Sequence, residues 1–373
     1  MSNHYSTIRL SDVRVGRRTK RLVRRTLKSG QLASGPRVIE FEERLRLLTN
    51  SEHFAAVSNG TSALQLALRT ASLGPGDEVI TTCFTFGATW NAILSSGASL
   101  RYVDISTQDF NLDLLAVQER VCERTKAIVP VHLYGLPSDL SRIRDLALSH
   151  QLRVIEDCAQ ALGAVSGGLS VGTIDIGTFS FYATKNLTTG EGGGVTCRSS
   201  DDFRKVKLLR NQGFLSRYDY EMLGENHRMT DVAASIGLGE ISGYKTQVER
   251  RRYNARRMSD GLAGVSEINL PTAPKARDHV WHQFTIVLTS GDSDERDRLK
   301  EYLALQQIES GVYYPLPLHE YPCFREHPRV IHEEATPVAN RIAQSCLSLP
   351  VHQRLKESDL DRVIETIRKF FGQ

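Results

Sequence analysis

Short runs of apolar and β-branched residues alternate with helical patterns through the first half of the chain. Residues 61–71 show the apolar spacing of a helix, and the Gly-Pro-Gly-Asp turn at 74–77 ends it. The runs with the length and composition of buried strands lie at residues 55–57, 78–82, 100–103, 127–131, 153–156 and 178–182. This alternation predicts an α/β domain with a mainly parallel sheet.

The pattern changes after about Asp231. An arginine-rich amphipathic helix follows, including residues 249–258, and a proline-containing break lies at 270–274. A predicted strand at 284–288 and predicted helices at 295–307 and 358–371 are typical of a smaller α+β unit. We therefore predict a large domain over residues 1–245, which includes an N-terminal helical segment, and a small C-terminal domain over residues 246–373.

The composition is that of a globular protein with a full hydrophobic core. Of its 373 residues, 40% are hydrophobic and 24% are charged. The 47 Lys and Arg against 43 Asp and Glu give a net charge of +4, which is too small to indicate a nucleic-acid-binding protein. Six cysteines without a Cys-x-x-Cys pair predict free thiols, with neither a disulfide framework nor a metal site.

The chain lacks the sequence features of a membrane or secreted protein. No stretch approaches the roughly 18 consecutive apolar residues that a membrane span needs. The first ten residues lack the apolar centre of a secretion signal. We expect a cytoplasmic protein that has neither a membrane nor a nucleic acid as its partner.

Two basic runs occur at helical spacing, one between Arg14 and Lys28 and the other between Arg250 and Arg257. Such runs are typical of solvated helix faces. The alternative is that their field attracts an anionic substrate, which would make the association rate depend on salt.

Three polar features follow predicted strands. The segment Ser58-Asn59-Gly60-Thr61-Ser62 opens a helix, where N–H groups and hydroxyls bind a phosphate. Asp157 ends one strand, and Lys185 follows the next. Each feature alone is typical of a helix cap or an exposed side chain. Together they supply what pyridoxal 5′-phosphate (PLP) requires: an amine that becomes neutral, a phosphate cradle and a carboxylate for the ring nitrogen.

Longer motifs extend this reading over most of the chain, from about residue 34 to residue 350. In chain order they read SNGTSALQLAL, GPGDEVITTCFTFGATWNAI, VPVHLYG, VIEDCAQALGA, SFYATKNLTTGEGGG, LLRNQG, GENHRMTDVAASIG and GVYYPLPLH. The series resembles that of the DegT/DnrJ/StrS-type PLP-dependent nucleotide-sugar aminotransferases. The resemblance implies a PLP fold-type I large domain, similar to aspartate aminotransferase, with a mainly parallel mixed sheet.

The resemblance also implies roles for residues around the cofactor ring. Lys185 would be the catalytic residue, which binds the cofactor covalently and then moves a proton. Asp157 would pair with the ring nitrogen, and Gln160 would bond to the phenolic oxygen. Phe86 would stack on the ring, with Phe84 as the alternative.

The cofactor phosphate would be held by Gly60, Thr61 and Ser180. In this family a residue from a second subunit joins them, for which Asn226 is the first candidate and Arg228 the alternative. The resemblance therefore implies a homodimer whose active sites are completed across the interface.

The same resemblance suggests residues for the acceptor sugar nucleotide. These are Ser34, Gly35, Tyr134, Tyr313, Tyr314 and His319.

The implied activity moves an amino group from L-glutamate or glutamine to a nucleotide-linked 3- or 4-keto-deoxyhexose, in amino-sugar biosynthesis. It would run as two half-reactions through a pyridoxamine 5′-phosphate (PMP) form. Because Lys185 stands where related dehydratases carry histidine, transamination is favoured over dehydration. A keto-cyclitol aminotransferase and a non-catalytic PLP-binding regulatory protein are the alternatives. The sequence leaves the nucleotide and the aminated carbon open.

Overall fold

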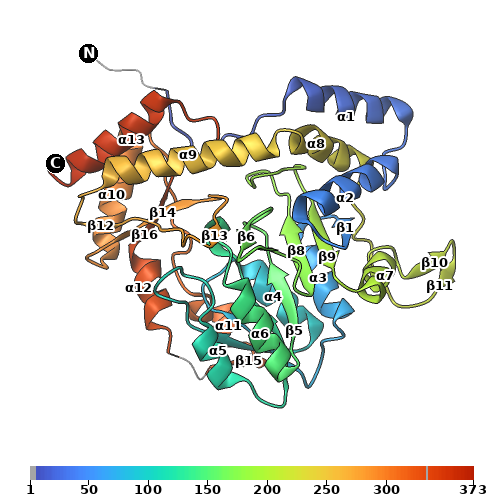
Figure 1. The fold of residues 1–373 in the computed structure, drawn as a ribbon. Helices are drawn as coiled ribbons and strands as arrows, with labels where there is room; N and C mark the ends of the chain where they lie inside the picture. Colours follow the sequence, from blue (N-terminus) through green and yellow to red (C-terminus); the bar gives the residue numbers. More distant parts are fainter. Residues whose placement is uncertain (1–5, 333–334) are drawn as a thin grey trace.

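The computed structural model of the chain describes residues 6–332 and 335–373 (Figure 1). Residues 1–5, the first half of the segment that lacks the apolar centre of a secretion signal, lie outside the described residues. Within the described ranges, no helix combines the length and the apolar character that crossing a membrane would require.

An eight-stranded sheet lies at the centre of the larger part of the molecule. Its strand order is β1-β9-β8-β5-β4-β2-β3-β15, and all neighbours pair in parallel except at β9, which is antiparallel to both β1 and β8. The strands are β1 (His53–Val57), β2 (Glu78–Thr82), β3 (Ser99–Val103), β4 (Thr125–Val129), β5 (Arg153–Asp157), β8 (Ile176–Ser180), β9 (Gly193–Cys197) and β15 (Val330–Ile331). All six strand runs predicted from the sequence belong to this sheet, which confirms the α/β class with a mainly parallel mixed sheet.

Helices cover both faces of this sheet, so each strand alternates between two cores. Ala55 and Val57 of β1 face one core, and Phe54 and Ala56 face the other. The first core is closed by α3 (Gly60–Thr70), α4 (Gly87–Ser96), α7 (Ser200–Leu209) and α12 (Pro337–Ser345). The second is closed by α2 (Pro36–Thr49), α5 (Leu114–Arg120), α6 (Leu140–His150) and α8 (Asp231–Ile241).

A smaller antiparallel sheet forms a third core near the C-terminus. Its order is β12 (Ile268–Asn269), β14 (Phe284–Leu288) and β16 (Cys346–Leu349), and it packs with α9 (Tyr244–Leu262), α10 (Ser293–Leu305) and α13 (Glu357–Phe370). Ile8 from the N-terminal segment packs into the same core, so the first described residues lie at the same end of the molecule as α13 (Figure 1). The boundary at residues 245/246 stays a prediction.

Helix α9 contributes side chains to two hydrophobic cores. Its Tyr244 and Val248 pack beside the large sheet, whereas Ala255, Met258 and Leu262 pack beside the small one. The remaining short elements are β6 (Val165–Ser166), β7 (Leu169–Ser170), β10 (Phe214–Ser216), β11 (Asp219–Tyr220), β13 (Arg277–Asp278), α11 (Pro322–Arg325) and the single turns Leu133–Gly135 and Leu318–Glu320.

The N-terminal helix α1 (Arg17–Ser29) packs on α8 through its few small polar residues (Figure 1). Thr19 Oγ1 donates to Glu240 at 2.7 Å, and the hydroxyls of Thr26 and Ser235 lie 2.7 Å apart. The basic side chains of α1 are exposed, as expected of a solvated helix face. Gly239 permits this contact, because a Cβ there would lie 2.7 Å from Thr19 Cα.

We expect Gly239→Ala to destabilise the protein by about 1–3 kcal/mol, since the added methyl group collides with the backbone of α1. Urea unfolding measures the change. Gly243→Ala is the matched control, because a Cβ at Gly243 meets its nearest neighbour at 3.4 Å. Equal stabilities of the two variants would contradict the close approach.

Candidate active site

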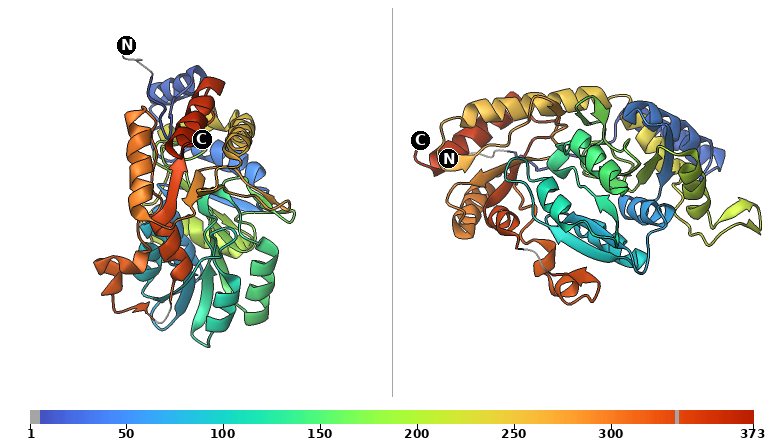
Figure 2. Two further views of the ribbon diagram at one scale, coloured as in Figure 1. Left: turned by 90° about the vertical axis from the view of Figure 1, so that its left-hand side faces the viewer. Right: turned by 60° about the horizontal axis from the view of Figure 1, so that its bottom comes forward.

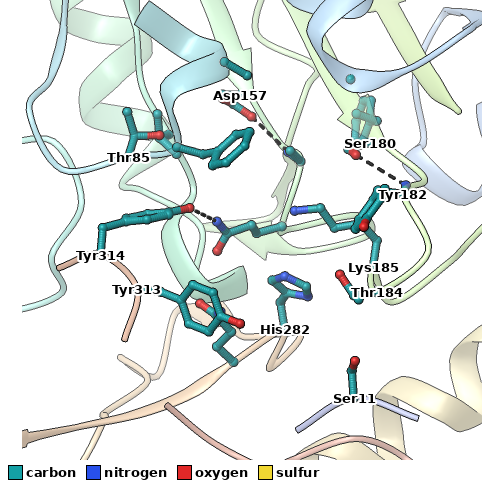
Figure 3. A pocket seen from close by; sticks show the side chains of 18 of the residues that line it. Ser11, Thr85, Asp157, Ser180, Tyr182, Thr184, Lys185, His282, Tyr313 and Tyr314 are labelled. Carbon is teal, nitrogen blue, oxygen red and sulfur yellow. Dashed lines mark hydrogen bonds between the residues drawn. The ribbon is translucent and has the colours of Figure 1, made fainter. Parts of the chain in front are cut away.

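A cavity of about 680 Å³ opens where the parallel strands end (Figure 3). Asp157 is the last residue of β5, Ser180 is the last residue of β8, and Thr85 follows β2. Tyr313 and Tyr314 line the cavity from the segment that follows α10. The carboxyl edge of an open α/β sheet is where such folds bind ligands.

Lys185 points into this cavity from the loop after β8 (Figure 3). Burial lowers the pKa of its amine from 10.5 to about 8, although the negative charge of Asp157 opposes the shift. At pH 7 roughly a tenth of such amines are neutral, against fewer than about one in a thousand at the ordinary pKa. Since the neutral amine is the nucleophile, Lys185 is suited to attack an aldehyde.

The carboxylate of Asp157 is buried and held by two donors. Thr89 Oγ1 donates to it at 2.8 Å, and the backbone N–H of Ala159 donates at 3.1 Å. These bonds fix the carboxylate of Asp157 on the cavity wall, and a carboxylate is the group that a protonated ring nitrogen would pair with.

The start of α3 forms a cradle with the end of β8. Asn59 caps the helix by accepting from the backbone N–H of Ser62 at 2.8 Å. Gly60 and Thr61 open the helix, and a Cβ at Gly60 would lie 2.8 Å from Ser180 Cβ. A helix N-terminus beside hydroxyl groups binds phosphate, so the cradle fits the phosphate of PLP.

Gln160 links the cavity floor to the tyrosine segment. Its Oε1 accepts from the backbone N–H of Tyr134 at 2.7 Å, and its Nε2 donates to the hydroxyl of Tyr314 at 3.2 Å. The hydroxyl of Tyr134 donates to the carbonyl of Tyr313. Tyr134 is buried and does not line the cavity, so within this chain it supports Tyr313 and Gln160 from behind.

Of the two candidate stacking residues, Phe86 is the one that lines the cavity. Its side chain is 64% exposed, whereas Phe84 is 1% exposed and packs in the core. The geometry therefore favours Phe86 as the ring contact.

Four of the predicted residues lie away from this cavity in the same chain. Ser34 and Arg228 line a separate depression of about 540 Å³, whose walls also carry Arg204, Lys207 and Arg210. Asn226 pairs with Asn211, which accepts from Arg228 Nη1 at 2.9 Å. The backbone N–H of Gly35 donates to Asp231 at 2.9 Å.

His319, a further predicted substrate contact, also lies outside the cavity lining. Its ring stacks on Tyr102 with centroids 4.7 Å apart, and its Nε2 lies 3.2 Å from the hydroxyl of Thr336. Its contacts in this chain are therefore packing contacts.

His282 is a cavity residue that the sequence reading missed (Figure 3). Its Nδ1 lies 3.3 Å from Asn186 Oδ1. Burial and the nearby charge of Lys185 hold the pKa of this imidazole well below its usual range, so it is neutral. The available signal was the polar and aromatic run His279 to Gln283, which stands directly before the apolar strand β14.

Behind Asp157, three potential metal-binding side chains meet in the core: His132, Glu156 and Cys158. The carboxylate of Glu156 accepts from His132 Nε2 at 3.0 Å and from the backbone N–H groups of Gly172 at 2.8 Å and Ile174 at 3.0 Å. These hydrogen bonds satisfy the acceptor atoms of the Glu156 carboxylate, so we interpret the cluster as one that holds β5 in place and does not bind a metal.

The pKa of Lys185 makes a prediction about cofactor loading. We expect the rate at which apoprotein bonds covalently to PLP to rise about tenfold per pH unit below pH 8 and then to level off, because only the neutral amine reacts. Stopped-flow absorbance of the bound cofactor from about pH 6 to about pH 10 measures this.

Lys185→Ala should form no covalent bond at any pH, while Lys369→Ala, on the exposed side of α13, should behave like the unchanged protein. A rate of cofactor bonding that levels off only above about pH 10 would show that the pKa of the Lys185 amine is not lowered.

The whole chain is similar to sugar aminotransferases. It is 41% identical, over 86% of its length and 85% of the relative's, to UDP-N-acetyl-3-dehydro-α-D-glucosamine 3-aminotransferase of Acidithiobacillus ferrooxidans. It is 35% identical, over 94% and 92% of the two chains, to dTDP-3-amino-3,4,6-trideoxy-α-D-glucose transaminase of Streptomyces venezuelae.

The fold has close counterparts among solved structures. Spr1654 of Streptococcus pneumoniae, described as a sugar aminotransferase, superposes with a TM-score of 0.91 at 28% identity, over 98% of both chains. It has been solved in PLP and PMP forms. This likeness confirms the predicted fold type, and with Lys185, Asp157 and the phosphate cradle in one cavity it identifies PLP as the cofactor.

The profile of the DegT/DnrJ/EryC1/StrS aminotransferase family matches residues 14–368. As the motifs predict, the chain belongs to this family of PLP-dependent aminotransferases.

Proposed function

We propose that the protein transfers an amino group from L-glutamate or L-glutamine to the ketone of a nucleotide-linked keto-deoxyhexose. The observation that carries the proposal is the meeting of Lys185, Asp157 and the α3 phosphate cradle in one cavity. The two relatives named above aminate sugars linked to UDP and dTDP and carry carbon 3 in their names, which supports a 3-keto acceptor.

Bound PLP supplies an aldehyde that takes up the amino group and a ring that stabilises negative charge. Lys185 is the group that moves protons, because its lowered pKa lets Nζ both take and return a proton near neutral pH. Asp157 offers a fixed anion to the ring nitrogen, and Phe86 covers one side of the cavity. His282 stays neutral beside Lys185, so it adds no positive charge there.

A homodimer with shared sites belongs to this proposal. The hairpin of β10 and β11 projects from the body (Figures 1 and 2). It carries exposed Leu215, Tyr218 and Tyr220, and Leu223 beside it is also exposed. Asn226 and Arg228 follow this segment; Arg228 lines the basic depression, and Asn226 pairs with Asn211, which also lines it. An exposed apolar segment beside polar and basic side chains that lie away from the cavity of their own chain supports a role in a partner's cavity.

Mixing two inactive variants tests the shared site. Lys185→Ala removes the amine, and Arg228→Ala paired with Asn226→Ala removes the groups offered to the partner. If these groups act across the interface, mixed dimers hold one intact site, and a random mixture recovers about a quarter of the activity. Refolded mixtures that stay inactive, while unchanged protein refolds with full activity, would show that the sites are not shared.

Two other activities compete with this proposal. A keto-cyclitol aminotransferase would use the same cofactor residues with an acceptor that has no nucleotide. A non-catalytic regulatory protein would keep the cavity without turnover, but the low pKa of Lys185 and the held carboxylate of Asp157 favour catalysis.

The acceptor is identified by following the visible absorbance of the lysine-bound cofactor. We expect L-glutamate or L-glutamine to abolish it, and one nucleotide-linked 3-keto or 4-keto-deoxyhexose to restore it, with UDP- and dTDP-linked 3-keto sugars as the first candidates. Recovery with a cyclitol ketone alone would favour the cyclitol alternative. If neither L-glutamate nor L-glutamine removes the absorbance from freshly loaded protein, the result would favour the non-catalytic regulatory protein.

A further inference from the structure

Helix α1 concentrates positive charge on the outer surface of the molecule. Seven of its 13 residues are basic and none is acidic, although the net charge of the whole chain is only +4. The basic residues, all of them exposed, are Arg17, Arg18, Lys20, Arg21, Arg24, Arg25 and Lys28. The rest of the chain therefore has a negative net charge, and the small total conceals a strongly basic surface.

The basic side chains cover the face of α1 that lies opposite α8. Thr19 and Thr26 are buried in the contact with α8. At about 3.6 residues per turn, Arg17, Arg21 and Arg24 lie on the other side of the helix. Figure 1 shows α1 on the outside of the molecule, next to α8. The basic face is about 20 Å long, because each residue of a helix rises about 1.5 Å.

None of these seven charges is paired. In the part of the chain that the structure describes, no carboxylate lies within ion-pair distance of any of them. Arg21 stands four positions from both Arg17 and Arg25, where like charges repel. The first turn contains Arg17, Arg18 and Lys20 and no acid, at the positive end of the helix dipole. The helix therefore forms against its own electrostatics, and an anionic partner would relieve the repulsion.

An extended anionic surface fits this face better than a small anion. The diphosphate of a nucleotide-linked sugar contacts only a few cations at once, whereas these seven charges are spread over about 20 Å. At physiological salt the field of exposed charges is screened within about 8 Å, which argues against attraction of a substrate from a distance. The face therefore requires a partner that contacts it along its length.

Apolar side chains flank the basic face and are exposed as well. Val13 and Val15 precede the helix, Leu27 lies in its last turn and Leu32 follows it, and their exposed fractions are 39–55%. The phosphate backbone of a nucleic acid offers these side chains no apolar contact. A lipid bilayer presents anionic headgroups with acyl chains directly beneath them. The combination of basic and apolar side chains matches a bilayer surface.

We propose that α1 binds the surface of a membrane that contains anionic lipids. The basic side chains lie among the headgroups, and Val13, Val15 and Leu27 enter the interface. The proposal departs from the sequence-based expectation of no membrane partner, because a small net charge and the lack of an apolar span do not measure the charge of one helix. A second copy of this face is no alternative occupant across a two-fold axis, since the two faces would repel. The proposal does not depend on the transfer reaction.

Co-sedimentation of the PLP-loaded protein with vesicles tests the proposal. We expect binding to phosphatidylcholine vesicles that contain about one-third phosphatidylglycerol, release by about 1 M salt, and no binding to pure phosphatidylcholine. The triple variant Arg17→Gln, Arg21→Gln and Arg24→Gln should bind roughly 100-fold more weakly, because each cation at an anionic surface contributes about fivefold in affinity.

The matched control is the triple variant Arg298→Gln, Lys300→Gln and Lys369→Gln, which removes three exposed positive charges from α10 and α13. Its vesicle binding should stay within about threefold of that of the unchanged protein. An equal loss in both triple variants would show attraction to the overall charge of the protein and would overturn the role of α1. Failure of the unchanged protein to bind the anionic vesicles would overturn it as well.

Leu27→Ser distinguishes a bilayer from an anionic polymer. It should weaken vesicle binding by about threefold or more, because part of an apolar side chain no longer enters the interface. Its binding to heparin, which has no apolar layer, should be unchanged. Binding to heparin without binding to vesicles, or vesicle binding that Leu27→Ser leaves unaltered, would assign the face to an anionic polymer and contradict the membrane contact.

Discussion

The position of the reacting groups depends on a buried carboxylate that never reaches the cavity. Glu156 and Asp157 are neighbours on β5, so their side chains point to opposite sides of the sheet. On the inner side, Glu156 is bonded to His132, which follows β4, and to the turn at 172–174, which leads into β8. A buried carboxylate is stable only when it accepts hydrogen bonds from such donors. These bonds therefore hold the end of β5, the residue after β4 and the turn before β8 in fixed positions relative to one another. Asp157 is thereby held in place on the cavity side.

The charges in the cavity suit several anionic ligands at once. Lys185 and Arg251 line the cavity together with the carboxylates of Asp157 and Glu191, while His282 contributes no charge. The α3 cradle adds backbone N–H groups at its own end of the cavity. The cradle lies at the start of α3 and Asp157 at the end of β5, so a phosphate bound at the cradle would leave the carboxylate of Asp157 available.

The sequence was most informative where a functional residue directly follows a strand. Gly60, Asp157 and Lys185 were singled out because each follows or ends a predicted strand, and the ends of parallel strands meet at one edge, whereas Ser180 was predicted from the family resemblance alone. Strand β9 was not predicted, because it opens with two glycines. A Cβ on the first would lie 2.9 Å from the backbone nitrogen of Gly60, so this position has no room for a side chain. Because glycine has no apolar side chain, the start of β9 lacks the hydrophobic pattern from which a strand is predicted.

Residues whose place in the cavity depends on contacts between distant segments could not be predicted from the sequence. His282 and Arg251 reach the cavity only because α9 folds back over the segment before β14. Tyr134 was expected at the substrate, yet its ring is buried because its hydroxyl bonds to a carbonyl nearly half the chain away. Ser34, Asn226 and Arg228 lie away from the cavity of their own chain, so under the proposed function they would act only across a dimer interface.

The continuous helix α9 has a consequence for how the molecule moves and unfolds. Because it belongs to two hydrophobic cores, the small sheet cannot swing as a rigid body without bending a 19-residue helix or breaking its packing. The bond between Tyr134 and Tyr313 ties the two parts together at a second point. We therefore expect damage to the C-terminal core to reach the cofactor cavity, and the two cores to unfold together.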